Sequence, residues 1–247
     1  MISAPFLVFG GLIGLVVGSY VTTAALRATR HEPSSWGRSH CDACGTPLNF
    51  LQTTPLLSFL ALKGACRTCG GPIDRIHLVG EIAGGVIGAV ATLAPPGVET
   101  LLVCALGFVL LAAAVVDART RRLPNVLTAA VALICLTLSA RAGVASLAVG
   151  LVAASLAFLL LMGLRRFRAA AGRDPGLGFG DVKLICALAC WLGAYTAWML
   201  ALAAVLGLLS VAIRPPLDGR IAFGPMIAAA SLGIAFGMEG GWWPAVI

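Results

Sequence analysis

The sequence predicts an all-α polytopic membrane protein of about eight transmembrane helices, with one small cytoplasmic four-cysteine insertion like a zinc ribbon. Of its 247 residues, 60% are hydrophobic and only 11% are charged. Its charge-free stretches reach about 20 residues, which is the length that a helix needs to cross a bilayer. The net charge of +7 does not indicate nucleic-acid binding, because the basic residues are scattered among the expected loops, where membrane orientation and anionic lipid headgroups explain them.

We expect eight stretches of the chain to cross the membrane as helices. They are residues 2–26, 78–95, 100–116, 126–140, 142–164, 184–194, 196–213 and 221–238. Alternate loops then lie on opposite faces, and one set of loops holds every Lys and Arg except Arg141. Such a bias indicates that this set is cytoplasmic. The first stretch has no basic segment before it, so we expect a retained helix rather than a cleaved signal.

Residues 184–213 leave the number of crossings open, because they are short for two crossings and long for one. Gly193 is the expected break between two helices. A single crossing would move Arg214 and Arg220 to the other face and weaken the charge asymmetry. The charge pattern therefore favours two crossings, and with them a total of eight.

The one sizeable polar insertion, residues 27–77, carries two CxxC pairs that are each followed by glycine. The four thiols are Cys41, Cys44, Cys66 and Cys69. Glycine lets the backbone turn tightly, so that amides approach the sulfurs. Four thiolates at this spacing suit a structural, tetrahedral Zn²⁺, which would supply much of the folding energy of so short a segment. Two disulfides are the alternative, but they need an oxidising compartment, whereas the basic loop indicates the cytoplasm.

Two aspartates, Asp117 and Asp181, each stand where an apolar stretch meets a basic loop on the face expected to be cytoplasmic. An ionised side chain in hydrocarbon costs roughly 2.5–3.5 kcal/mol on insertion scales, so such residues indicate a functional site. Two carboxylates in close contact share one proton. One can then activate a water while the other protonates a carbonyl oxygen. We interpret the pair as the catalytic residues of an intramembrane aspartyl protease.

Each aspartate also has a structural interpretation. Asp117 could end a helix and be neutralised by the arginines that follow it. Asp181 follows Gly178 and Gly180 and could cap the next helix, because Asp at a helix start accepts amide hydrogen bonds and suits the macrodipole. The two glycines would also let a substrate strand approach the backbone closely.

Six short motifs occur in a characteristic order along nearly the whole chain. They are Gly18-Ser19-Tyr20 with Arg27, the two cysteine pairs, Pro55 to Leu60 with Gly64-Ala65-Cys66, Asp117 with Leu123-Pro124, Gly178 to Leu184, and Phe223-Gly224-Pro225. Together they resemble the type IV prepilin peptidases, which are membrane aspartyl proteases of the GxGD class. The chain departs from the family's pattern at Thr22, where Asn is usual, and at Thr53 and Thr54.

This resemblance implies an aspartic endopeptidase of the bacterial inner membrane with its active site facing the cytoplasm. Such enzymes cut the basic leader of type IV prepilins or type II secretion pseudopilins after a Gly, just before a hydrophobic helix. Members with the four-cysteine domain also methylate the new amino terminus, using S-adenosylmethionine. The chain is then divided into a first helix (1–26), a zinc-binding candidate methyltransferase part (27–77) and a peptidase domain (78–247). The residues themselves show neither a GxGxxG fingerprint nor a βαβ pattern.

Four further residues are expected to support substrate binding or catalysis: Gly178, Gly180, Lys183 and Glu81. Glu81 resembles the family's glutamate beyond the second cysteine pair, and pairing with Arg75 is the alternative to a part in methyl transfer. Lys183 is either a neighbour of the aspartates or an anchor in the lipid headgroups. The expected partners are a prepilin or pseudopilin with a basic leader and a hydrophobic helix, and membrane lipid. No motif names the residues that would bind the methyl donor.

Two other classes of protein remain as alternatives. A non-catalytic zinc-ribbon scaffold for pilus or secretion assembly would use the aspartates only as helix ends. A proton-coupled transporter would pair intramembrane carboxylates, but inverted repeats and sites near the bilayer midplane are expected there. The sequence shows no repeat, and both aspartates lie at one surface.

Overall fold

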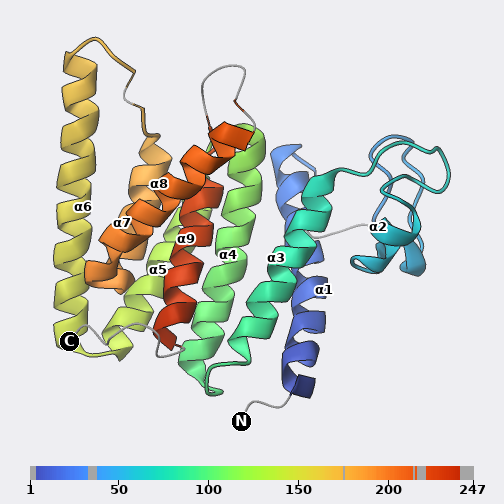
Figure 1. Ribbon diagram of the computed structural model, residues 1–247, viewed down its shortest axis with the longest axis horizontal. Coiled ribbons are helices and arrows are strands. Elements are labelled where there is room, and N and C mark those ends of the chain that lie inside the picture. Colours follow the sequence, from blue (N-terminus) through green and yellow to red (C-terminus); the bar gives the residue numbers. More distant parts are fainter. Residues whose placement is uncertain (1–3, 33–37, 175, 214, 216–220, 240–247) are drawn as a thin grey trace. The chain divides into compact units, whose positions relative to one another are not determined.

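A computed structural model describes residues 4–32, 38–174, 176–213, 215 and 221–239 (Figure 1). Within these ranges the chain is helical, and its only β structure is two isolated bridges. It divides into two compact units, Met1–Pro96 and Gly97–Ile247. Arg214 and Arg220, whose side of the membrane would distinguish one crossing from two, lie outside the described residues.

The first unit consists of two long helices and the cysteine-bearing insertion between them. Helix α1 spans Ala4–Thr29 and α3 spans Arg75–Ala91, while the insertion holds the 3₁₀ turn η1 (Phe50–Thr53) and the short helix α2 (Leu57–Ala61). The α3 helix begins where the Asp74 carboxylate accepts a hydrogen bond from the Ile76 amide, at 3.0 Å. This side chain satisfies one of the amides that a helix start leaves free.

Helices α1 and α3 lie side by side (Figure 1) and touch through glycines spaced four residues apart, which places them on one face of each helix. The stripes are Gly10, Gly14 and Gly18 on α1, and Gly80, Gly84 and Gly88 on α3. A Cβ atom at Gly14 would lie 2.2 Å from the Gly84 carbonyl oxygen, and one at Gly84 would lie 2.4 Å from the Gly14 carbonyl oxygen. The two backbones are therefore in direct contact, as in the small-residue interfaces of membrane helices.

The second unit is a helical bundle built around α7. Its helices are α4 (Val98–Thr120), α5 (Asn125–Arg141), α6 (Val144–Ala170), α7 (Phe179–Leu192), α8 (Thr196–Ile213) and α9 (Gly224–Glu239). Helix α7 packs between α5 and α6, and α9 packs against α4, α7 and α8 (Figure 1). Val182, Ile185 and Leu188 of α7 are fully buried. The core of this unit therefore surrounds the helix that carries Asp181.

The expected break at Gly193 is confirmed. Gly193 has a φ of +52°, in the region that favours glycine, and the turn η2 (Gly193–Tyr195) separates α7 from α8. Among the described residues, four stretches are long and apolar enough to cross a membrane: Ala4–Thr29, Val98–Thr120, Val144–Ala170 and Phe179–Ile213. Helical membrane-spanning character is thus confirmed. The total of eight crossings stays a prediction, because α7, with 14 residues, is about 21 Å long and shorter than a hydrocarbon core of about 30 Å.

The glycine contact between α1 and α3 predicts that a single methyl group there is costly. Gly84→Ala would force the two helices apart, and we expect a loss of about 1–3 kcal/mol of stability, measured as a lower thermal unfolding midpoint in detergent. Gly163→Ala on α6 is the matched control, because nothing lies within 4 Å of its Cβ position. The control should keep or raise the midpoint, since Ala favours helix. An unchanged midpoint in both variants would contradict the close packing.

Candidate active site

Asp117 lies in the last turns of α4 and is only 4% exposed. Its Oδ2 accepts a hydrogen bond of 2.8 Å from the backbone amide of Gly224, the first residue of α9. A helix start offers free amides and positive potential, so it suits a carboxylate. A Cβ atom at Gly224 would lie 2.8 Å from this Oδ2 and 3.0 Å from the Asp117 Cβ. The approach of α9 to Asp117 therefore requires glycine at this position.

Asp181 lies in the first turn of α7 and is half-buried. Its Oδ2 accepts a hydrogen bond of 3.2 Å from the amide of Gly178, the residue that caps α7. A Cβ atom at Gly178 would lie 2.9 Å from that oxygen. The interpretation of Asp181 as the capping residue is therefore corrected: the helix starts earlier than expected, and its carboxylate folds back onto the cap from the third helical position.

The turn between α4 and α5 places the two aspartates in one region. Leu123 of this turn packs on Gly180, where a Cβ atom would lie 3.0 Å from the Leu123 Cβ. Lys183 donates to the side-chain oxygen of Asn125 at the start of α5. The α9 helix contacts both α4 and α7. As a result, the carboxylates of Asp117 and Asp181 are close enough to interact electrostatically.

The two remaining supporting residues of α7 have contacts of their own. The Lys183 ammonium lies 5.2 Å from the centre of the Phe179 ring, in addition to its bond to Asn125. Gly180 leaves room for Leu123. Among the arginines expected to neutralise Asp117, Arg121 acts on its carboxylate electrostatically. Lys183 and Gly180 thus hold the start of α7 against the turn that follows Asp117.

The four cysteines of the insertion form a cluster that could hold a metal ion. Their sulfur atoms all lie within 4.8 Å of one another, and the Cys41 and Cys69 sulfurs are 3.9 Å apart. A tetrahedral site with Zn–S bonds of about 2.3 Å has sulfur–sulfur distances of about 3.8 Å, so the geometry fits zinc. All eight cysteines of the chain are free thiols, so the two disulfides considered as an alternative are not formed.

Each CxxC pair folds into a tight turn that closes at its glycine. The Gly45 amide donates to the Cys41 carbonyl oxygen at 2.8 Å, and the Gly70 amide donates to that of Cys66 at 2.9 Å. Both glycines have a φ of +70°, which is the reason for glycine after each pair. Backbone amides of Cys69 and Thr68 lower the pKa of the Cys66 thiol to about 6. The turns therefore aim backbone amides at the sulfurs, and the Gly71 amide likewise donates to the Cys69 sulfur at 3.4 Å, although neighbouring cysteines raise the pKa of Cys69 to about 11.

Glu81 lies on α3, where it is buried and accepts hydrogen bonds on both carboxylate oxygens. The Ser19 hydroxyl of α1 donates to Oε1, and the backbone amide of Leu56 donates to Oε2, each at 2.8 Å. Among the described residues, Glu81 is therefore bonded to Ser19 and Leu56 and not to Arg75. Glu81 thus ties α1, the insertion and α3 together.

Sequence reasoning placed neither Gly224 beside Asp117 nor Ser19 beside Glu81. Both residues stood in motifs that were identified, Phe223-Gly224-Pro225 and Gly18-Ser19-Tyr20. The motifs therefore singled out Gly224 and Ser19, but they did not indicate which carboxylate each of these residues contacts.

Comparison with known proteins finds relatives over most of the chain. Residues 12–94 match the "Bacterial Peptidase A24 N-terminal domain", and residues 104–214 match the "Type IV leader peptidase family". The "Prepilin leader peptidase/N-methyltransferase" of Burkholderia pseudomallei (strain K96243) is 30% identical over an alignment of 264 positions, which covers 93% of this chain and 85% of the relative. The protein of the same description from Dickeya chrysanthemi is 31% identical, over 94% of this chain and 93% of its own. No solved structure matches the chain.

Proposed function

The chain belongs to the type IV leader peptidase family, and from this premise we propose that it cleaves the leader of prepilins and methylates the amino terminus that cleavage exposes. One observation carries the first activity. Asp117 and Asp181 are each held through one oxygen by a glycine amide, and α9 contacts both of the helices that carry them. Both activities appear in the printed description of the relatives from Burkholderia pseudomallei and Dickeya chrysanthemi.

The carboxylate pair supports hydrolysis without a nucleophilic side chain. Each aspartate uses Oδ2 for its glycine amide, and we assign Oδ1 of each to the water and the scissile carbonyl. One carboxylate takes a proton from the water as its oxygen bonds to the carbonyl carbon, while the other, protonated, donates to the carbonyl oxygen. The tetrahedral adduct then breaks its C–N bond, and the amine leaves with a proton.

The membrane setting of this reaction follows from the charge pattern. We propose eight crossings in the bacterial inner membrane, with the aspartates at the cytoplasmic face, because all but one of the basic residues fall in one set of loops. A type IV prepilin or type II pseudopilin would present its hydrophobic helix to the apolar surface of residues 78–247. Its basic leader would then be cut after a Gly. A scaffold without catalysis would give no reason for Gly224 to approach Asp117 so closely.

The second activity is assigned to residues 27–77 together with the helices that flank them. The methyl donor would be S-adenosylmethionine, and Cys41, Cys44, Cys66 and Cys69 would hold one structural Zn²⁺. With four sulfur ligands, the ion would have no open position for water, so it would stabilise the insertion rather than act in the reaction.

Loss of either carboxylate is expected to abolish cleavage. Asp117→Asn and Asp181→Asn should each lower the cleavage rate at least about a thousandfold, and the double variant should be no worse, because the two groups act as a unit. The assay is intact mass spectrometry of a synthetic prepilin incubated in detergent with enzyme and S-adenosylmethionine. Asp174→Asn, an exposed aspartate of the loop before α7, is the matched control and should cleave at the wild-type rate. Robust cleavage by either dyad variant would reject the mechanism.

Glycine at position 224 is expected to set the position of Asp117. Gly224→Ala would push the carboxylate away, and a misplacement near 1 Å lowers catalysis by up to about 100-fold. Gly233→Ala on the same helix is the control, because its nearest neighbour, the Leu202 Cδ2, would lie at an ordinary 3.9 Å. The expected result is slow cleavage by the first variant and normal cleavage by the second. Equal rates would show that the contact does not matter.

Elemental analysis tests the zinc site. The purified chain should contain about one zinc ion, since four thiolates complete its coordination. Cys66→Ser should lose the metal, whereas Cys104→Ser, a change in α4, should keep it. Less than about half an equivalent of zinc in undamaged wild-type protein would count against the site.

A further inference from the structure

A cavity opens within the first unit, between the end of α1, the insertion and the start of α3. It encloses a volume of about 160 Å³ and opens to solvent. Small-molecule sites usually measure about 300–1,000 Å³, so the enclosed part would hold only a portion of a nucleoside-sized ligand, and the rest would lie in the open mouth. Its walls mix apolar side chains with ionisable ones, which is the usual composition of such sites.

Glu81 brings a buried carboxylate to the wall of this cavity. It is 8% exposed, and its two hydrogen bonds come from uncharged donors, the Ser19 hydroxyl and the Leu56 amide. A carboxylate can accept about four hydrogen bonds, so Glu81 can accept further hydrogen bonds besides these two. A buried charge is costly unless a charge of opposite sign accompanies it. Among the described residues no Lys or Arg is bonded to Glu81, so a cationic ligand would fit beside it.

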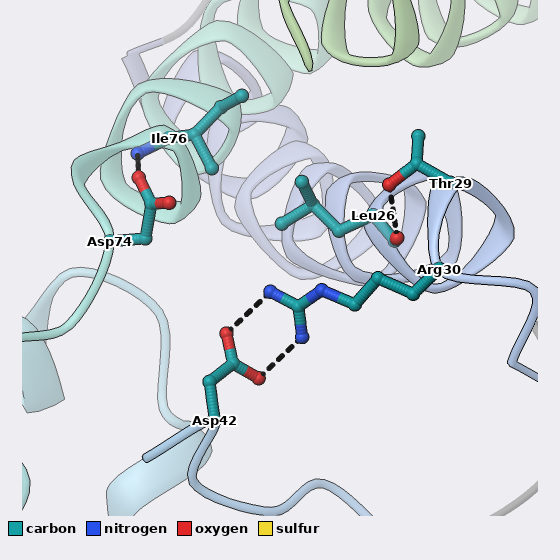
Figure 2. A network of polar contacts seen from close by, with 6 residues as sticks. All are labelled: Leu26, Thr29, Arg30, Asp42, Asp74 and Ile76. Atoms are coloured by element: carbon teal, nitrogen blue, oxygen red, sulfur yellow. Dashed lines mark hydrogen bonds and ion pairs between the residues drawn. The ribbon is translucent and has the colours of Figure 1, made fainter. Parts of the chain in front are cut away.

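Two of the other charged groups of the cavity, Arg30 and Asp42, are paired with each other. Arg30 binds Asp42 through two hydrogen bonds of 2.8 Å (Figure 2), and this contact holds the pKa of the Asp42 carboxyl below its usual range. His77 also lines the cavity, where burial lowers the pKa of its imidazole. The cavity wall carries four carboxylates against three arginines. It therefore does not have the excess of positive charge that a polyphosphate ligand would need.

The Arg30–Asp42 pair also links the cavity to the cysteine cluster. Asp42 directly follows Cys41, and Arg30 extends from the end of α1 (Figure 2). Since both side chains are nearly half exposed, the pair adds at most a modest amount to stability. Its effect is geometric, because it fixes the first cysteine turn against α1 and so shapes the cavity wall.

The apolar part of the cavity offers a flat surface beside the charged part. Phe59 lines it together with Leu26, Leu48 and Ile73. The Phe59 ring packs on Gly64, where a Cβ atom would lie 3.0 Å from the end of the ring. An aromatic face flanked by aliphatic side chains suits a planar base. A ligand that joins a planar base to a positive charge would match both parts.

We propose that this cavity binds S-adenosylmethionine, with Glu81 facing the positively charged sulfonium end and the wall around Phe59 facing the adenine. The inference rests on the proposed methylation and assigns its donor site to residues of α1, the insertion and α3. In the reaction the amine nitrogen, which first gives a proton to water, bonds to the methyl carbon. The carbon–sulfur bond breaks with its electron pair left on sulfur. The donor becomes the neutral S-adenosylhomocysteine, which no longer offers Glu81 a positive charge.

The difference in charge between donor and product gives a direct binding test. Equilibrium dialysis of the full chain in detergent, with its metal retained, measures the affinity for S-adenosylmethionine and for S-adenosylhomocysteine separately. We expect the wild-type chain to prefer the donor by about tenfold or more, because a charged partner strengthens the contact. Glu81→Gln keeps an oxygen for the Leu56 amide, so its fold should persist, and it should lose most of that preference by weakening donor binding.

Two further variants complete the test. Phe59→Leu should weaken donor and product equally, and it decides the question if Glu81→Gln does not fold. Glu99→Gln is the matched control, because Glu99 pairs with Arg141 in the second unit. It should leave both affinities at the wild-type values.

The results separate this inference from the proposed function. The donor site alone would be overturned if the wild-type chain methylates the pilin but Glu81→Gln keeps the preference for the donor. The same holds if Phe59→Leu keeps both affinities. A wild-type chain that neither binds the donor nor methylates the pilin would overturn the proposed methylation, and the donor site with it. Leader cleavage, read in the same mass spectra, reports on the peptidase independently.

Discussion

The hydrogen bond from the Gly224 amide to the Asp117 carboxylate is the contact on which the aspartate site depends. A buried carboxylate must be hydrogen-bonded, and the free amide at the start of α9 meets that need. Glycine is required there because a side chain would collide with Asp117. This contact places α9 against α4, and α9 also contacts α7. Asp181 therefore lies in the same region, where the Asp117 carboxylate acts on it electrostatically.

A similar constraint shapes the first unit. Gly18 and Gly80 bring α1 and α3 into backbone contact, and a Cβ atom at Gly18 would lie 2.6 Å from the Gly80 carbonyl oxygen. Ser19 and Glu81 are the next residues of the two helices, and they form a hydrogen bond. The register of the glycine contact thus sets the position of Glu81. In both units, the position of a buried carboxylate depends on glycines that let two backbones approach.

The sequence predicted the helical membrane architecture, the placement of the two aspartates in one region and the cysteine cluster, because apolar length, charge placement and CxxC spacing are local patterns. It placed the start of the α7 helix too late, after Asp181 as a cap, whereas α7 begins at Phe179, because Gly178 and Gly180 are typical of loops and disfavour helix. The partners of Asp117 and Glu81 could not be predicted. They are backbone amides and a serine from distant segments, and such contacts leave no periodic pattern.

The proposed mechanism requires Asp117 and Asp181 to act on one water and one peptide bond. The most direct test is an experimental structure of the chain bound to a prepilin peptide in which a hydroxyl-bearing, statine-type group replaces the scissile bond. We expect this hydroxyl to lie within hydrogen-bond distance of both carboxylates, while Gly224 still contacts Asp117. A hydroxyl that binds only one of the carboxylates, or neither, with the two held apart, would contradict it.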